Sequence, residues 1–256
     1  MKKKHLFFVI LLLANCLLLS AQTFSVDVTN QFNDGQKYRA KKDYVNAVKC
    51  YKYAAEHGLA AAQYELAMCY ERGEGVSQNL KEAFKWLKMA ADGGWPFAYT
   101  SVGTYYYEGV GVTRDLVESV KWYRKASDEF NNAGAQYCLG MAYEQGDGVK
   151  LDYTEAAKWY QKSAEQGHPY AANNLAHVYL RGQGVDKNEN TAFYWFRKAA
   201  EGGSMNAQCS MGAGYLEGRG GLPVDKKEAM RWFEMAAEQG MTKAQIIVNK
   251  LENGEI

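Results

Sequence analysis

The chain has 256 residues, of which 47% are hydrophobic and 23% are charged, a composition typical of a globular protein. Without residues 1–21, which carry three lysines and no acidic residue, the net charge is 27 − 29 = −2. Such a nearly neutral surface gives no electrostatic reason to expect nucleic acid as a partner. Only 3 prolines leave room for long helices, whereas the 25 glycines require a recurring structural role.

Residues 1–21 are typical of a secretory signal peptide. Lysines at positions 2–4 precede an apolar run over residues 6–19, and Ala21 follows this run. The run is shorter than the roughly 20 apolar residues that span a membrane. We predict cleavage after Ala21 and hence an exported protein in the periplasm, the cell envelope or the medium, with no membrane span after signal removal. A retained segment that serves as a membrane anchor is the alternative.

A shortened helical hairpin is expected near the N-terminus. Residues 22–31 are predicted to be a linker, and residues 32–58 a hairpin with its second helix around Ala47 and Tyr51. The connection between its helices lacks the G-x-G of later segments and is four residues shorter than theirs, a spacing typical of a tetratricopeptide hairpin. Terminal units of stacked arrays are commonly atypical in this way.

The rest of the chain repeats itself with a period of 36 or 37 residues. One tryptophan marks each copy: Trp86, Trp122, Trp159, Trp195 and Trp232. The copies span residues 59–94 (repeat 1), 95–131 (repeat 2), 132–167 (repeat 3), 168–203 (repeat 4) and 204–240 (repeat 5). Residues 241–256 form a C-terminal capping helix and tail. Repetition at this period predicts a stacked array of supersecondary units.

Each copy is predicted to contain two antiparallel helices. In the first, helix A, apolar or small residues recur at offsets 0, 4, 5 and 8, which lie on one face of a helix; an example begins at Ala62. A G-x-G segment ends helix A. The second, helix B, begins after an Asn or Asp that is followed by Glu three residues later in four of the five copies, which indicates a capping box with a glutamate that bonds back to the cap N–H. Helix B ends at glycine, except after Phe130, where one inserted residue predicts a looser turn.

These residues resemble a known repeat. The pattern A-x-x-x-L-[AG]-x-x-Y-x-x-G-x-G-V, followed by the N-cap, the tryptophan and an Ala-Ala pair, resembles the Sel-one-like repeat (SLR), a relative of the tetratricopeptide repeat. The resemblance implies an all-α, right-handed α-solenoid (superhelix) of antiparallel helical hairpins with helix A on the concave side. It also implies a role as an adaptor or scaffold, since such proteins act in signalling, secretion and quality control, including exported bacterial examples.

No catalytic, cofactor-binding or metal-binding residue is predicted, and no cofactor. Histidines stand only at positions 5, 57, 168 and 177, and no G-x-S-x-G, S-x-x-K or K-T-G segment occurs. The chain is therefore not expected to be an enzyme. The alternative is a cell-wall-directed hydrolase or β-lactam-binding protein, because cysteine-rich bacterial relatives have been described as β-lactamases; their cysteine pairs within each repeat are absent here.

The cysteines beyond the signal segment leave two possibilities open. Cys50 and Cys69 fall on consecutive predicted helices and could form a disulfide, or all four cysteines, with Cys138 and Cys209, are buried thiols.

By resemblance to tetratricopeptide repeats, the helix-A residues that face away from the core are expected to bind a protein or peptide. They mix aromatic, methionine and polar side chains, which suit recognition of such partners. The predicted concave-face residues are Tyr64, Met68, Thr100, Thr104, Tyr107, Tyr137, Met141, Asn173, His177 and Leu180. No dense basic cluster accompanies them. The sequence therefore predicts an exported interaction scaffold or adaptor.

Overall fold

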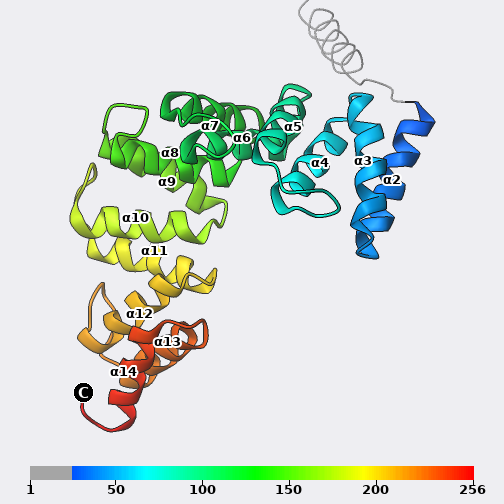
Figure 1. Cartoon of the computed structure of the whole chain (residues 1–256). Coiled ribbons are helices and arrows are strands. Elements are labelled where there is room, and N and C mark those ends of the chain that lie inside the picture. Colours follow the sequence, from blue (N-terminus) through cyan, green and yellow to red (C-terminus); the bar gives the residue numbers. More distant parts are fainter. Residues whose placement is uncertain (1–24) are drawn as a thin grey trace, which may run out of the picture. The chain divides into compact units, whose positions relative to one another are not determined.

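The protein is described by a computed structural model that covers residues 25–256 (Figure 1). These residues form thirteen α-helices and no β-strand. Within each of two compact units, consecutive helices pack against each other as antiparallel pairs, so the predicted all-α repeat solenoid is confirmed. The predicted signal peptide, residues 1–21, lies outside the described residues. The chain divides into two compact units, one ending at Trp95 and one covering Pro96–Ile256.

The first unit contains four helices: α2 (Val26–Ala40), α3 (Tyr44–Glu56), α4 (Ala60–Arg72) and α5 (Leu80–Asp92). Each packs against the next. Residues 26–31 were predicted to be part of a linker but are helical. The Ser25 hydroxyl accepts a hydrogen bond from the Val28 N–H (3.3 Å), and the Val28 side chain is buried, so a cap and a core contact together start the helix earlier.

The second unit contains nine helices in a consecutive array, shown from green to red in Figure 1. They are α6 (Pro96–Glu108), α7 (Leu116–Phe130), α8 (Ala133–Gln145), α9 (Tyr153–Glu165), α10 (Pro169–Arg181), α11 (Glu189–Glu201), α12 (Met205–Glu217), α13 (Lys226–Glu238) and α14 (Thr242–Glu252). Even-numbered helices from α4 to α12 are helix A of a repeat, and odd-numbered helices from α5 to α13 are helix B. The last helix, α14, packs against α13 through the buried Ala244 and Val248.

Within a repeat, an aromatic ring of helix B lies on a glycine of helix A. A Cβ atom added at Gly140 would lie 2.4 Å from Cδ1 of Tyr160, and one at Gly212 would lie 2.7 Å from Cε2 of Phe233. Both rings are at most 1% exposed. The ring follows the repeat tryptophan by one residue. The small residue of helix A therefore lets the two helices approach closely around this ring.

The repeat tryptophans are largely core residues. Four of the five are at most 8% exposed, whereas Trp195 is half-buried. A lysine covers the outer ring face of two of them: the Lys162 ammonium group lies 4.1 Å from the Trp159 ring centroid, and Lys125 lies 4.6 Å from Trp122. The tryptophans thus close the outer side of each helix pair and offer little free surface.

Only half of the predicted capping box forms. The Asp152 carboxylate accepts a hydrogen bond from the Glu155 N–H (3.0 Å), and all five helix-B caps act in this way. The return bond from glutamate was predicted wrongly. The Asp152 N–H donates instead to the Tyr143 carbonyl oxygen at the end of helix A (2.9 Å), so it has no need of the glutamate, and Glu155 pairs with Lys158 (2.5 Å).

The turn after α7 is tighter than predicted. Helix α7 extends through the inserted residue to Phe130, and α8 begins at Ala133. Asn131 adopts a left-handed conformation (φ 49°), and the Asn132 side chain caps α8 by accepting from the Ala135 N–H (2.8 Å). Asparagine tolerates both roles, so the insertion lengthens the helix without loosening the turn.

Candidate protein-binding face

The ten predicted site residues all lie on helix A of repeats 1 to 4. Eight of them occupy the fifth or ninth position of their helix, and Tyr107 and Leu180 occupy the twelfth. Met68 and Asn173 are buried (9% and 8% exposed), so they offer little surface to a partner. The other eight are half-buried. Tyr64 and Met68 belong to the first unit, and the other eight residues belong to the second.

Three of the predicted residues on α6 are engaged within the fold. The Thr104 hydroxyl donates to the Thr100 carbonyl oxygen (3.1 Å) and lies 3.3 Å from the Tyr123 hydroxyl. The Tyr107 hydroxyl donates to the Asp147 carboxylate (3.2 Å). Burial and this carboxylate raise the pKa of Tyr107. These side chains connect α6 to its neighbours, so their polar groups serve packing within the array.

An aromatic cluster joins α8 to α10. The Tyr137 ring stacks on His168 at a centroid distance of 4.9 Å, and Tyr170 lies 6.4 Å from Tyr137. Tyr170 is 59% exposed, the most exposed aromatic residue of this cluster. Burial lowers the pKa of His168, and its Nδ1 accepts a hydrogen bond from the Ala171 N–H (3.2 Å) as the cap of α10. The cluster therefore presents neutral aromatic surface.

Sequence reasoning missed His168 and Tyr170. His168 is the N-cap residue of α10, and no role was predicted for either residue. A signal existed for Tyr170, because it stands three and seven residues before Asn173 and His177 and therefore lies on the same side of α10. Its exposure, however, depends on the position of α8.

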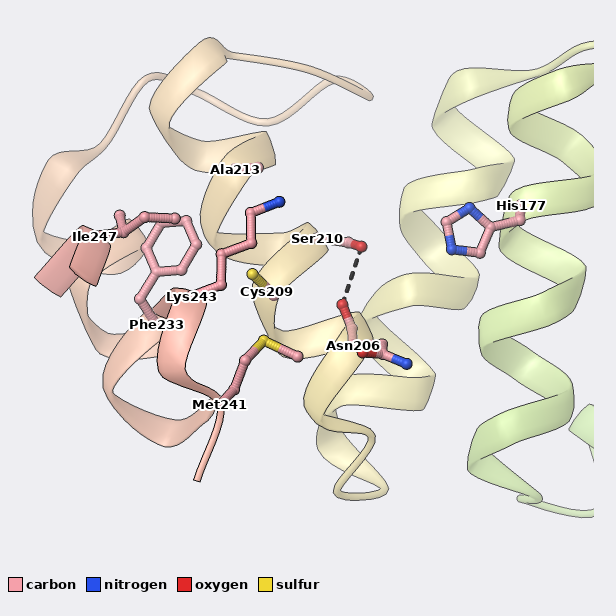
Figure 2. Close-up of a pocket in the computed structure, with 9 residues that line it drawn as sticks. All are labelled: His177, Asn206, Cys209, Ser210, Ala213, Phe233, Met241, Lys243 and Ile247. Carbon is pink, nitrogen blue, oxygen red and sulfur yellow. Dashed lines mark hydrogen bonds between the residues drawn. The ribbon is translucent and has the colours of Figure 1, made fainter. Parts of the chain in front are cut away.

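A groove of about 350 Å³ lies between α10, α12, α13 and α14 (Figure 2). His177 borders it on α10. The remaining lining residues come from the later helices: Asn206, Cys209, Ser210, Ala213, Phe233, Met241, Lys243 and Ile247. His177 is one of the ten predicted residues; the contribution of α14 was missed because that segment was expected to serve only as a cap.

His177 closes one side of the groove. Its ring lies edge-on against Phe196 at a centroid distance of 5.0 Å. Burial lowers its pKa, and the positive charge of Arg181 acts in the same direction, whereas Glu144 opposes it. The neutral imidazole is consequently the dominant form at neutral pH and has both a donor and an acceptor nitrogen.

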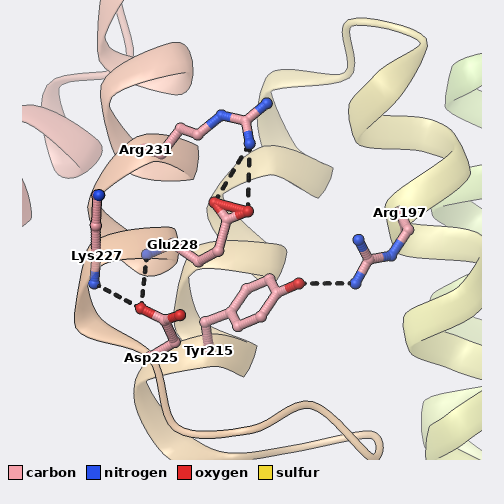
Figure 3. A network of polar contacts seen from close by, with 6 residues as sticks. All are labelled: Arg197, Tyr215, Asp225, Lys227, Glu228 and Arg231. Atoms are coloured by element: carbon pink, nitrogen blue, oxygen red, sulfur yellow. Dashed lines mark hydrogen bonds and ion pairs between the residues drawn. The ribbon is translucent and has the colours of Figure 1, made fainter.

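A separate polar network connects repeat 4 to repeat 5 (Figure 3). The Arg197 guanidinium donates to the hydroxyl of Tyr215 (2.9 Å), and Arg124 bonds Tyr143 in the same way between repeats 2 and 3. Asp225 caps α13, while Glu228 pairs with Arg231 (3.2 Å). In repeats 3 and 5, the tyrosine near the end of helix A is therefore a contact with the preceding repeat.

Within residues 25–256, no group of three His, Cys, Asp or Glu side chains is arranged to hold a metal ion. The four cysteines in that range are free thiols, with no disulfide between Cys50 and Cys69. Burial raises the pKa of Cys69 and of Cys138 to about 11. None of the described helices is both long enough and apolar enough to cross a membrane.

Comparison with known proteins shows what the chain resembles. The model of the Sel1 repeat matches six segments, residues 32–59, 60–95, 96–129, 133–168, 169–204 and 206–241. The first of these is the segment whose spacing we compared to a tetratricopeptide hairpin. No curated protein matches the chain.

Two solved structures are similar in sequence and fold. A protective antigen of uropathogenic Escherichia coli with an SLR fold is 37% identical over 90% of this chain, with a TM-score of 0.83. This chain covers 50% of that antigen, so it spans half the antigen's length. A Sel1 repeat protein from Oxalobacter formigenes is 35% identical over 83% of this chain and 86% of its own, with a TM-score of 0.78. An immunity protein from Pseudomonas aeruginosa, 18% identical over 84% of this chain and 83% of its own, shares the fold (TM-score 0.52).

Proposed function

Because the chain belongs to the Sel1 repeat family, we propose that it is an exported scaffold or adaptor that binds a protein or peptide through helix A of its second unit. The binding face runs over α8, α10 and α12 to α14. The observation that carries the proposal is the groove of about 350 Å³ between α10, α12, α13 and α14, most of whose lining residues come from α12 and α14. Extended surfaces of this kind are the usual binding sites of solenoids.

The aromatic cluster beside the groove supports the same face. Tyr170 combines 59% exposure with ring neighbours that restrict its motion, which lowers the entropy lost when a partner covers it. Tyrosine also contributes both apolar area and a hydroxyl group to an interface. The proposal includes no catalysis, since it assigns no reactive group to this face.

Site-specific crosslinking tests the proposal. A photoreactive phenylalanine analogue is placed at Tyr170, and a matched control places it at Tyr194, a tyrosine of α11 that is 54% exposed but belongs to helix B. In the envelope of the producing cell, we expect one discrete adduct from position 170 that purified Tyr170→Ala protein competes poorly and wild-type protein competes well. Equal adducts from both positions, or none from position 170, would contradict the proposed face.

Separate experiments test the proposed export and the proposed absence of catalysis. N-terminal sequencing of the protein from the producing cell should start at Gln22; a start at Met1 would favour a retained anchor. The purified protein should hydrolyse a chromogenic β-lactam no faster than buffer does, and clear turnover would replace the scaffold proposal with the enzymatic one.

A further inference from the structure

The groove contains polar groups that the fold leaves unused. Lys243, the second residue of α14, extends across the groove above Cys209 (Figure 2). Among the described residues, its ammonium group forms no ion pair or hydrogen bond. Burial raises the pKa of the Cys209 thiol, and the Lys243 charge partly offsets this effect, so the positive charge acts on the inside of the groove. The ring nitrogens of His177 likewise have no hydrogen-bond partner among residues 25–256.

The floor of the groove is apolar. Phe233 lies beneath it, and Met241 and Ile247 border it from α14, next to Ala213. Methionine and isoleucine here can cover a side chain of a partner, and methionine adapts to different shapes. Apolar surface with one unpaired cation at its rim matches a ligand that has the complementary pair, an apolar group beside an anion.

We propose that this groove binds an extended segment of a partner protein in which a large apolar side chain stands next to an aspartate or glutamate. The apolar side chain lies on Met241 and Ile247, and the carboxylate pairs with Lys243. A lone lysine acts as a single point charge and suits one carboxylate, whereas phosphate groups are commonly held by several cationic or bidentate contacts. The inference rests on the proposed function and names the chemistry of its partner.

A random peptide library displayed on phage, selected against the full chain, tests this inference. The matched variants are Lys243→Glu and Lys227→Glu. Lys227 occupies the same second position of its helix, α13, and is exposed, but it does not line the groove. Both variants change the net charge equally and place glutamate at a helix N-terminus, where it is tolerated. Circular dichroism confirms that each variant is folded.

We expect the wild type and Lys227→Glu to enrich peptides with an acidic residue beside a large apolar one. Lys243→Glu should bind these peptides at least about tenfold more weakly and should enrich lysine or arginine at the acidic position. Peptides that lack acidic residues, or whose binding Lys243→Glu leaves unchanged, would overturn the groove proposal but leave the scaffold function intact. Failure to enrich any peptide on the wild type would count against both.

Discussion

Side-chain size at one position of helix A decides how closely each helix pair packs. Gly35, Gly103, Gly140 and Gly212 each lie against an aromatic ring of helix B, at distances that leave no space for a Cβ atom. Repeats 1 and 4 have alanine at this position, and both alanines are fully buried. The difference is local, since each repeat adjusts the spacing of its own helices to the volume of one side chain. Helix caps also depend on single residues, because one acceptor atom of the cap side chain bonds a free N–H of the first turn.

A histidine cap makes the stability of α10 depend on pH. His168 accepts the Ala171 N–H through Nδ1 only while it is neutral, and burial lowers its pKa below the ordinary value of 6.5. The unfolded chain therefore binds the proton more readily. The stabilisation that the neutral His168 cap gives is complete above the unfolded-state pKa, and it is lost as pH falls below that value towards the folded-state pKa.

The test replaces His168 with Asn, the residue that caps α8 at the equivalent position. Between about pH 7.5 and about pH 5, we expect the wild type to lose about 1 kcal/mol more unfolding free energy than His168→Asn, the usual value of one cap. Urea unfolding at both pH values measures the difference. Because His177 remains in both proteins, its own titration cancels, and identical pH profiles would contradict the prediction.

At the scale of the helix, local hydrogen bonds define where each helix begins and ends. Every helix B begins at an Asn or Asp side chain that accepts an N–H of the first turn. Every helix A of repeats 1, 3, 4 and 5 ends at a glycine in the left-handed conformation. The cap N–H of helix B bonds back to the tyrosine carbonyl of helix A, so the loop between them is held at both ends.

This arrangement predicts unequal roles for the two acidic residues at the start of α9. Asp152→Ala should lower the unfolding free energy by about 1 kcal/mol, because it leaves a helix N–H without its acceptor. Glu155→Ala should cost less than about 0.5 kcal/mol, since Glu155 pairs only with the exposed Lys158. Chemical denaturation of the two variants compares them directly. Equal losses would indicate that the glutamate bonds the cap after all.

At the scale of the molecule, the array depends on contacts between successive repeats. The second glycine of the G-x-G loop touches the preceding helix B: a Cβ at Gly184 would lie 2.3 Å from the Tyr153 carbonyl carbon. The Thr154 hydroxyl donates to the Gly184 carbonyl oxygen (3.2 Å). Gly148 and Gly75 approach Leu116 and Tyr44 in the same way. Stability in such arrays is a sum of repeat terms and nearest-neighbour terms, and this glycine belongs to the second kind.

Substitutions of two glycines in one loop distinguish the stability of a single repeat from the stability of the contact between repeats. Gly182→Ala is strained by its positive φ (70°) and by a contact of 3.1 Å with the Lys187 Cβ in the same loop, and it should cost about 1–3 kcal/mol. Gly184→Ala has a similar φ but also collides with the backbone of the preceding repeat, so we expect a further loss of about 1–3 kcal/mol. The unfolding free energy of Gly184→Ala should also depend less steeply on denaturant concentration, because repeats 3 and 4 unfold less cooperatively. Equal stability of the two variants would contradict a role of Gly184 between repeats.

The amino-acid sequence alone was sufficient to predict the helices of the five repeats, their order and most of their core residues. These features depend on interactions within a few residues: the period of apolar residues, the Asp or Asn that caps helix B, and the glycine that ends helix A. Trp159 and Leu139 could therefore be assigned to the core from their repeat positions alone, and both are buried.

Only the tertiary structure decided which side chains meet on the binding face. The groove joins His177 to Ile247, residues 70 positions apart, and their proximity is set by how α10, α12 and α14 stack. The same stacking buries Asn173 and exposes Tyr170, although both belong to one side of α10. The helical period predicts the side of the helix on which a residue lies. Whether solvent, a neighbouring side chain or a groove lies on that side depends on the volume of the side chains in the next repeat.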